Sequence, residues 1–102
     1  MKERTPPDLS QELKEKRKQI DLIDQKLVSL LNQRIRIALE IGKIKRTMGE
    51  KIYDPNREKE VLERLRLRVK NKDPLKEKDL EKIFRTIISV SRKSQNRIKP
   101  KR

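Results

Sequence analysis

The sequence predicts an all-α protein with three helices, because of its hydrophobic periodicity, its charge content and its scarcity of glycine. Apolar residues recur at helical spacing along most of the 102 residues. Charged residues make up 45% of the chain, and only two residues are glycine. This composition suits long helices with solvated outer faces and argues against a sheet-rich fold. We expect one domain over residues 1–102, with residues 1–8 and 99–102 as loose tails.

The first predicted helix covers residues 8–49. Asp8 and Gln11 have the spacing of a capping box at its start, and Gly49 marks its end. Its apolar residues form an a/d seam over five heptads, in two neighbouring rows. The rows hold Leu13, Ile20, Leu27, Ile41 and Met48, and then Ile23, Leu30, Ile37 and Ile44.

This first helix is too long to be covered by the rest of the chain. It would span about 60 Å at 1.5 Å per residue, whereas a compact domain of this size has a radius of gyration of only ~13 Å. The uncovered apolar stripe is typical of a partner surface, so we expect a homodimer whose long helices pack together. The alternative is a monomer in which the helix breaks near Gly42.

Two shorter helices follow. The second begins with Asp54 as N-cap and Pro55 in the first position, and the segment NKDPL at 71–75 ends it. Its expected buried face holds Val61, Leu62, Leu65 and Val69. The third runs from about Leu75 to about Ile98. One side of it carries Leu80, Phe84, Ile87, Ile88, Ser91, Gln95 and Ile98.

The composition also limits the chemistry. The chain has no cysteine and no histidine, which removes disulfides, thiolates, the commonest metal ligand and the commonest general base. We see no signal peptide and no apolar stretch near the ~20 residues that span a bilayer, so we expect a cytoplasmic protein without a membrane partner. The net charge of +14 indicates an anionic partner, either nucleic acid, a membrane or a small substrate.

Arg34 occupies a seam position of the first helix, where a core residue belongs. A buried charge costs several kcal/mol unless it is paired, and no acid lies three or four residues from Arg34. Lys45 is eleven residues further on, so it points the same way to within about 20°, ~16 Å along the axis. Ala38 lies between them and is small. Two long cations beside one hollow predict an anion site.

Further polar residues lie on or beside apolar faces, and each has a simpler alternative interpretation. Ser91 and Gln95 continue the buried line of the third helix, although Gln95 could be an exposed residue at the helix end. Arg57 and Glu58 precede the apolar face of the second helix, where they could be exposed first-turn charges. Lys45 could instead favour the C-terminal dipole of its helix.

Arg17 is rotated roughly 100° away from the face of Arg34. It could pair with Asp21 one turn on. It cannot easily reach the same hollow in its own chain, but across a crossed or antiparallel dimer it could.

Three segments together resemble the all-helical chorismate mutases, the AroQ class. They are RKQIDLIDQKLVSLLNQRIRIALEIGKIK, IYDPNREKEVLERL and IFRTIISVSRKSQ. The resemblance covers about residues 9–96. It implies conversion of chorismate to prephenate, a step towards phenylalanine and tyrosine, by a rearrangement that needs no cofactor or metal. It also implies an intertwined homodimer in which an arginine of one chain completes the site of the other.

The resemblance assigns roles to residues at matching positions. Arg17 of the partner and Arg34 are expected to hold the two carboxylates, with help from Ser91. Lys45 and Gln95 are expected to donate hydrogen bonds to the ether oxygen as its C–O bond breaks. A glutamate in place of Gln95 would have to be protonated to do so.

The remaining roles fall at the start of the second helix. Glu58 is expected to accept a hydrogen bond from the ring hydroxyl of chorismate, and the backbone of Asp54 to help hold that hydroxyl. Arg57 is expected to order the site and face the polar edge of the substrate.

Three alternatives to a mutase stay open at this point. Isochorismate-pyruvate lyases have a similar fold, but the REKE pattern around Glu58 favours the mutase. A nucleic-acid-binding protein would fit the charge and the basic end RKSQNRIKPKR, but the chain has one Phe, one Tyr and no Trp for stacking, and no recognised motif. The third alternative is a non-catalytic mutase module. We expect a small-molecule substrate and no nucleic acid.

Overall fold

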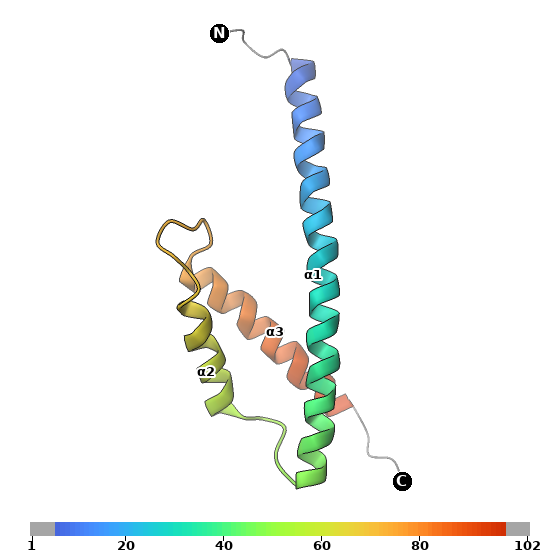
Figure 1. Ribbon diagram of the computed structural model, residues 1–102, viewed down its shortest axis with the longest axis vertical. Helices are drawn as coiled ribbons and strands as arrows, with labels where there is room; N and C mark the ends of the chain where they lie inside the picture. Colours follow the sequence, from blue (N-terminus) through green and yellow to red (C-terminus); the bar gives the residue numbers. More distant parts are fainter. Residues whose placement is uncertain (1–5, 98–102) are drawn as a thin grey trace. The chain divides into compact units, whose positions relative to one another are not determined.

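The computed structural model describes residues 6–97, with side chains from residue 8, and its regular structure over this range is entirely helical. The three helices are α1 (Pro6–Met48), α2 (Pro55–Arg66) and α3 (Glu77–Arg97) (Figure 1). The predicted all-α fold with three helices is confirmed. The expected tails at 1–5 and 99–102, and Ile98, lie outside the described residues.

Helix α1 begins two residues earlier than predicted. It starts at Pro6, and Asp8 lies inside its first turn rather than capping it. Proline is favoured in the first turn because its fixed φ suits the helix and its missing N–H has no partner there anyway. The expected capping box and the assignment of residues 6–8 to a tail were therefore wrong. The helix continues through Gly42 to Met48, so the alternative of a break near Gly42 was also wrong.

Gly49 ends α1, as predicted. Its φ of 72° lies in the left-handed region that favours glycine. The Glu50 N–H donates to the Lys45 carbonyl at 2.8 Å, and the Gly49 N–H donates to the Arg46 carbonyl at 3.1 Å. This pair of bonds is a Schellman motif, and it turns the chain back beside the last turn of α1.

Helix α2 begins as predicted and ends earlier. Asp54 caps it, with its Oδ1 accepting from the Arg57 N–H at 3.0 Å. The helix stops at Arg66, before the expected break at 71–75, because the Leu65 and Arg66 carbonyls accept from N–H groups only three residues on. Val69 is therefore half-buried in the following turn and not on the helix face.

Helix α3 begins at Glu77, two residues after the expected start at Leu75. Asp73 accepts from the Lys70 N–H through Oδ2 at 3.0 Å, and its own N–H donates to the Lys70 carbonyl at 2.9 Å. This local turn, followed by a proline, holds the chain out of the helix until the Leu80 N–H donates to the Lys76 carbonyl.

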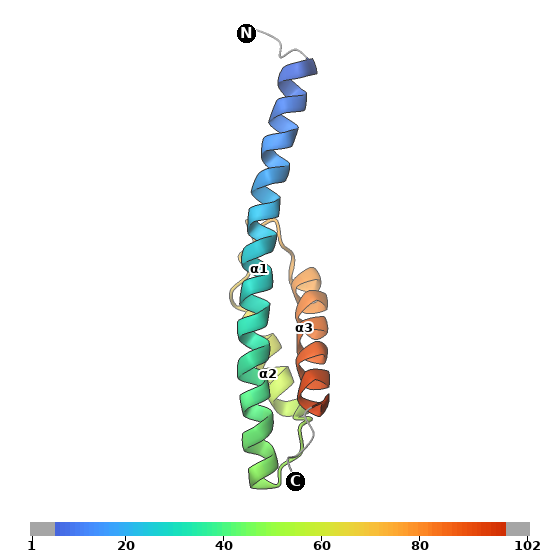
Figure 2. The ribbon, with the colours of Figure 1, turned by 90° about the vertical axis from the view of Figure 1, so that its right-hand side faces the viewer.

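The described chain forms two compact units, residues 6–33 and residues 34–97. In the first unit no described side chain is buried. In the second, α2 and α3 pack together and run in opposite directions, and the second half of α3 is bonded to residues 34–48 of α1 (Figures 1 and 2). No helix within residues 6–97 is long and apolar enough to cross a membrane.

The core of the second unit is small and partly polar. Four apolar side chains of the described residues are buried in it: Ala38, Leu62, Leu80 and Ile88. Three polar side chains of α3 are buried as well: Ser91, Ser94 and Gln95. Buried polar groups need hydrogen-bond partners, and the partners of these residues define the site.

Candidate active site

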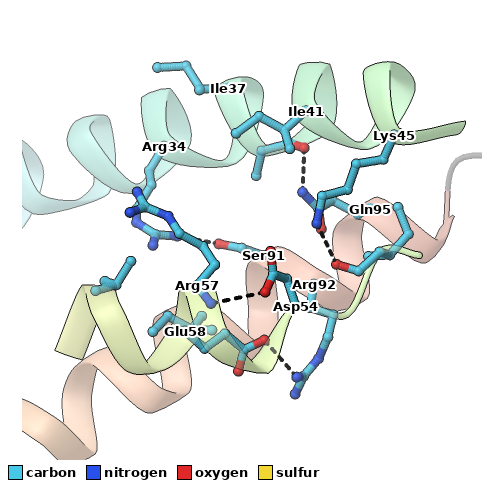
Figure 3. Close-up of a pocket in the computed structure, with 14 residues that line it drawn as sticks. Arg34, Ile37, Ile41, Lys45, Asp54, Arg57, Glu58, Ser91, Arg92 and Gln95 are labelled. Atoms are coloured by element: carbon cyan, nitrogen blue, oxygen red, sulfur yellow. Dashed lines mark hydrogen bonds and ion pairs between the residues drawn. The ribbon is translucent and has the colours of Figure 1, made fainter. Parts of the chain in front are cut away.

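A cavity of about 290 Å³ lies among residues 34–45 of α1, the start of α2 and the second half of α3 (Figure 3). Its volume is at the lower end of the range of ~300–1000 Å³ for small-molecule sites. Seven of the eight predicted site residues line it: Arg34, Lys45, Asp54, Arg57, Glu58, Ser91 and Gln95. The rest of the wall is mainly aliphatic, including Ile37, Ile41 and Val61.

Arg17 is the eighth predicted residue, and it belongs to residues 6–33. Its side chain is exposed. No ion pair joins Arg17 to Asp21, although both lie within the described residues.

Arg34 is half-buried, and its Nη1 donates to the Ser91 hydroxyl at 2.7 Å. Burial, followed by repulsion from the charge of Arg57, lowers the pKa of Arg34 from its ordinary value. That ordinary value is so far above neutrality that the guanidinium keeps its charge. Within residues 8–97 no carboxylate pairs with it, so the cavity contains an uncompensated cation.

Ser91 orients Arg34. Its Oγ donates to the Ile87 carbonyl one turn back at 2.9 Å and accepts from Arg34 with a lone pair. The hydroxyl proton is therefore directed at the helix backbone and not at the cavity. In this arrangement the Ser91 hydroxyl holds the Arg34 guanidinium beside the cavity.

Lys45 is the second cation of α1 at the cavity. Its Nζ donates to the Ile52 carbonyl at 3.0 Å (Figure 3). The turn after Gly49 brings that carbonyl within reach. An ammonium group has three donors, so two N–H bonds of Lys45 are left for a ligand, and no ion pair neutralises Lys45 within the described residues.

Gln95 faces Lys45 from α3 and is buried, so its interpretation as an exposed residue at the helix end was wrong. Its Nε2 donates to the Ala38 carbonyl at 2.7 Å (Figure 3). A flipped amide would set two oxygens against each other, so this bond fixes which end of the amide is the donor. One N–H of Nε2 is left for a ligand.

Gly42 allows α3 to approach α1 at this point. A Cβ atom on Gly42 would lie 3.2 Å from Cγ and 3.3 Å from Cβ of Gln95, closer than ordinary van der Waals contact. The Gln95 carbonyl also accepts from Arg46 Nη2 at 3.3 Å, which ties the end of α3 to α1. Ala38, Gly42 and Arg46, which follow one another at intervals of four residues on α1, thus set the position of Gln95.

The start of α2 supplies the remaining predicted residues. The Asp54 carboxylate caps the helix through Oδ1. Arg57 is mostly exposed and pairs with Glu60 at 2.9 Å, so it is a first-turn surface charge as well as a cavity residue. Glu58 is half-buried and pairs with Arg92 instead of being solvated.

Arg92 is the charged residue of the cavity that sequence reasoning missed. Its Nη1 lies 2.9 Å from Glu58 Oε2, and its guanidinium lies 4.6 Å from the centre of the Tyr53 ring. A signal was present, because Arg92 follows the buried Ile88 by four residues and therefore lies on the same side of α3.

The donor set indicates what the site can bind. Four cationic side chains and two carboxylates line the cavity, and the two carboxylates already accept hydrogen bonds from the protein. Within residues 8–97 no cluster of three or more acidic side chains could hold a metal ion. The arrangement suits a small anion with more than one negative group, held in one conformation by fixed donors.

These features describe a helical protein with a cation-rich cavity at the junction of three helices. The family model for chorismate mutase type II matches residues 16–96, and the chain belongs to that family. It is 40% identical over 93 residues to the bifunctional chorismate mutase/prephenate dehydratase of Aquifex aeolicus, covering 87% of this chain and 25% of that protein. It is 41% identical over 56 residues to the chorismate mutase of Methanocaldococcus jannaschii, covering 55% and 57%. The chain thus spans about a quarter of the first relative and little more than half of the second.

Solved structures agree with this assignment. The structure of chorismate mutase (form II) from Thermus thermophilus matches with a TM-score of 0.80 and 29% identity, over 87% of this chain and 99% of that chain. The chorismate mutase from Helicobacter pylori in complex with prephenate matches with a TM-score of 0.76 and 34% identity, over the same shares.

Proposed function

We propose that the protein catalyses the rearrangement of chorismate to prephenate, a step in the synthesis of phenylalanine and tyrosine. The observation that carries the proposal is the placement of Arg34 and Lys45 on one side of the cavity, without acidic partners among the described residues, opposite the fixed Gln95 amide. Chorismate is a dianion, so the substrate itself supplies the missing negative charge.

The proposed reaction is an intramolecular pericyclic step, which needs no nucleophile and no proton transfer. An enzyme accelerates it by holding the substrate in a compact conformation and by stabilising the charge that develops as the C–O bond breaks. Arg34, oriented by Ser91, binds one carboxylate. Lys45 and Gln95 direct their remaining N–H groups at the ether oxygen, where negative charge grows towards the transition state.

The ring hydroxyl is proposed to bind at the start of α2. Glu58 Oε2 is taken by Arg92, which leaves Oε1 to accept from the hydroxyl. The backbone of Asp54 is proposed as the second contact, while Oδ1 of its carboxylate caps the helix. Arg57 lies at the rim, where it faces the polar edge of the substrate.

We also propose that the active form is an intertwined homodimer in which Arg17 completes the site of the partner. Among the described residues, eighteen large apolar side chains are exposed, against four buried apolar ones. Five of the exposed ones continue the seam through residues 13–30 with exposed fractions of 50–58%: Leu13, Ile20, Ile23, Leu27 and Leu30. A stripe of this length marks an association surface, and a second copy carries the matching stripe.

The activity is tested with purified protein by following the loss of the ultraviolet absorbance of chorismate and by identifying prephenate as the product. Isochorismate is offered in parallel, because formation of pyruvate and salicylate would instead identify a lyase of the same fold. Failure to convert chorismate at any protein concentration that sustains the dimer would refute the proposal.

The dimer is tested by sedimentation. We expect a species of twice the 12.3 kDa chain, and a monomer for Leu27→Arg, which places a charge on the seam. Leu67→Arg is the matched control, because Leu67 is 86% exposed in the turn after α2. Equal sedimentation of wild type and Leu27→Arg would contradict the proposed surface.

A further inference from the structure

Arg92 connects two residues on either side of the α2 N-terminus. Its guanidinium pairs with Glu58 at 2.9 Å and lies 4.6 Å from the centre of the Tyr53 ring. The Arg92 and Glu58 side chains are 32% and 27% exposed, so the pair is partly shielded from water. Ion pairs and cation–π contacts are both stronger in such surroundings than at a fully exposed site.

The same ion pair belongs to the walls of two cavities. Glu58 and Arg92 line the proposed active site, and they also line a second hollow of about 550 Å³. The second hollow has a strongly polar wall that includes Arg66 and Arg85. Glu58 lines both cavities, so the bond from Arg92 is what holds its carboxylate in one orientation among the described residues.

One oxygen of Glu58 has a partner and the other does not. Oε2 accepts from Arg92, and no described residue donates to Oε1. A carboxylate anchored through one oxygen keeps the other at a fixed place, and this preorganisation is what a binding site needs from a long, flexible side chain. Tyr53 in turn holds Arg92 through its ring face.

We propose that Arg92 is a positioning residue that holds Glu58 Oε1 towards the ring hydroxyl of the substrate and closes the wall against the second hollow. The inference rests on the proposed mutase function. The contacts of Arg92 support this role, because its Nη1 pairs with the Glu58 carboxylate and its guanidinium face lies over the Tyr53 ring.

The test combines single and double variants. Arg92→Met keeps an unbranched side chain of similar stem and removes the ion pair, and we expect kcat/KM to fall between about tenfold and 100-fold, as for a misplaced binding group. Arg92→Lys keeps the charge and should recover a large part of this loss. In a Glu58→Gln background, Arg92→Met should lower kcat/KM little further, because the carboxylate that Arg92 positions is already replaced.

A substrate analogue with hydrogen in place of the ring hydroxyl distinguishes a positioning role of Arg92 from a purely structural one. With this analogue, wild type and Arg92→Met should show nearly equal kcat/KM. Arg85→Met is the matched control: it removes an arginine of the same helix that pairs with Glu81 at 2.7 Å, outside the proposed active site. We expect activity of Arg85→Met within about twofold of wild type.

Two outcomes would overturn the inference while leaving the mutase function intact. One is an active wild type with an equally active Arg92→Met. The other is a loss of kcat/KM in Arg92→Met that is just as large in the Glu58→Gln background, or that persists with the analogue. Either result would place Arg92 directly on the substrate. If Arg92→Met does not fold, Tyr53→Leu removes the ring that holds Arg92 and should give a smaller loss that also disappears with the analogue. An inactive wild type would instead refute the function itself.

Discussion

The two halves of α1 carry the same apolar seam but have different surroundings. In residues 8–33 every described side chain is exposed except that of Glu12, which is intermediate. In residues 34–48, Ala38 and Gly42 are buried and Arg34 and Lys45 are half-buried. Only the second half lies against another helix of its own compact unit, through the bonds of Arg34 and Ala38 to α3.

The comparison shows that α1 has a small and polar face beside its apolar seam, and that the two meet at the cavity. The residues that face α3 are small or polar and recur at positions 34, 38, 42 and 45. The seam residues beside them stay exposed even in the second half, with exposed fractions of 58% for Ile37, 58% for Ile44 and 63% for Met48. The small and polar face builds the cavity together with Ile37 and Ile41 of the seam, and the rest of the apolar face is left for the proposed second copy.

The largest expected effect concerns the polar face. Lys45→Ala removes the cation beside the breaking C–O bond, and we expect kcat to fall by about 10³-fold, as for the loss of a preorganised donor. Lys43→Ala is the matched control, because Lys43 is exposed on the same helix outside the cavity. Steady-state kinetics on both variants, with circular dichroism to verify folding, checks this prediction. Equal activities of the two variants would show that Lys45 is not at the reacting centre.

The next effect tests whether the first half of α1 serves the cavity of a second chain. Arg17→Ala and Lys45→Ala should each be nearly inactive alone. Unfolded together and refolded, they pair at random, half of the dimers are mixed, and each mixed dimer has one intact site. About a quarter of wild-type activity should return for two symmetric sites. No recovery in verified mixed dimers would place Arg17 in its own chain's site or outside catalysis.

Gln95→Glu should convert a pH-independent site into an acid-dependent one. The amide donates to the Ala38 carbonyl, and a carboxyl group there donates only when protonated, which favours a raised pKa. Lys45 and Arg46 on α1 oppose that shift. Activity of the variant should therefore be present below the pKa of the new carboxyl and decline as pH rises through it.

The wild type should show no such slope. Burial and Arg57 lower the pKa of Arg34, but the cation that binds the carboxylate is present at all pH values below that pKa and is lost only as pH rises through it, well above neutrality. The measurement is a profile of kcat/KM for wild type and Gln95→Glu between pH 5 and 9, in steps of about one unit. Superimposable profiles would contradict the assignment of Gln95 as a donor.

The smallest effect concerns the contact that lets α3 approach α1. Gly42→Ala raises helix propensity by about 1 kcal/mol, but its Cβ would press on Gln95 at 3.2 Å. We expect little change in melting temperature and a decrease in kcat of a few fold, because the amide shifts by a few tenths of an ångström. Gly49→Ala is the contrasting control, since its strain is at a φ of 72° and far from Gln95. Gly49→Ala should lower the melting temperature and leave kcat nearly unchanged.

Much of the local structure was predictable because it depends on short-range chemistry. The Asp54–Pro55 start of α2 and the Gly49 end of α1 follow from cap and turn preferences within a few residues. The errors were also local. Asp8 was read as a cap although the prolines before it already begin the helix, and Val69 was placed on a helix that ends at Arg66.

The sequence by itself determined the three helices and the placement of Arg34 and Lys45 on one side of the first, because helical spacing alone sets both. Only the tertiary structure decided that the Ser91 proton is directed away from the cavity, that the Gln95 amide is fixed by Ala38, and that Arg92 holds Glu58. The bonds that join α1 to α3 here span 57 residues. Their geometry depends on how two helices approach across Gly42, and no local pattern records that approach.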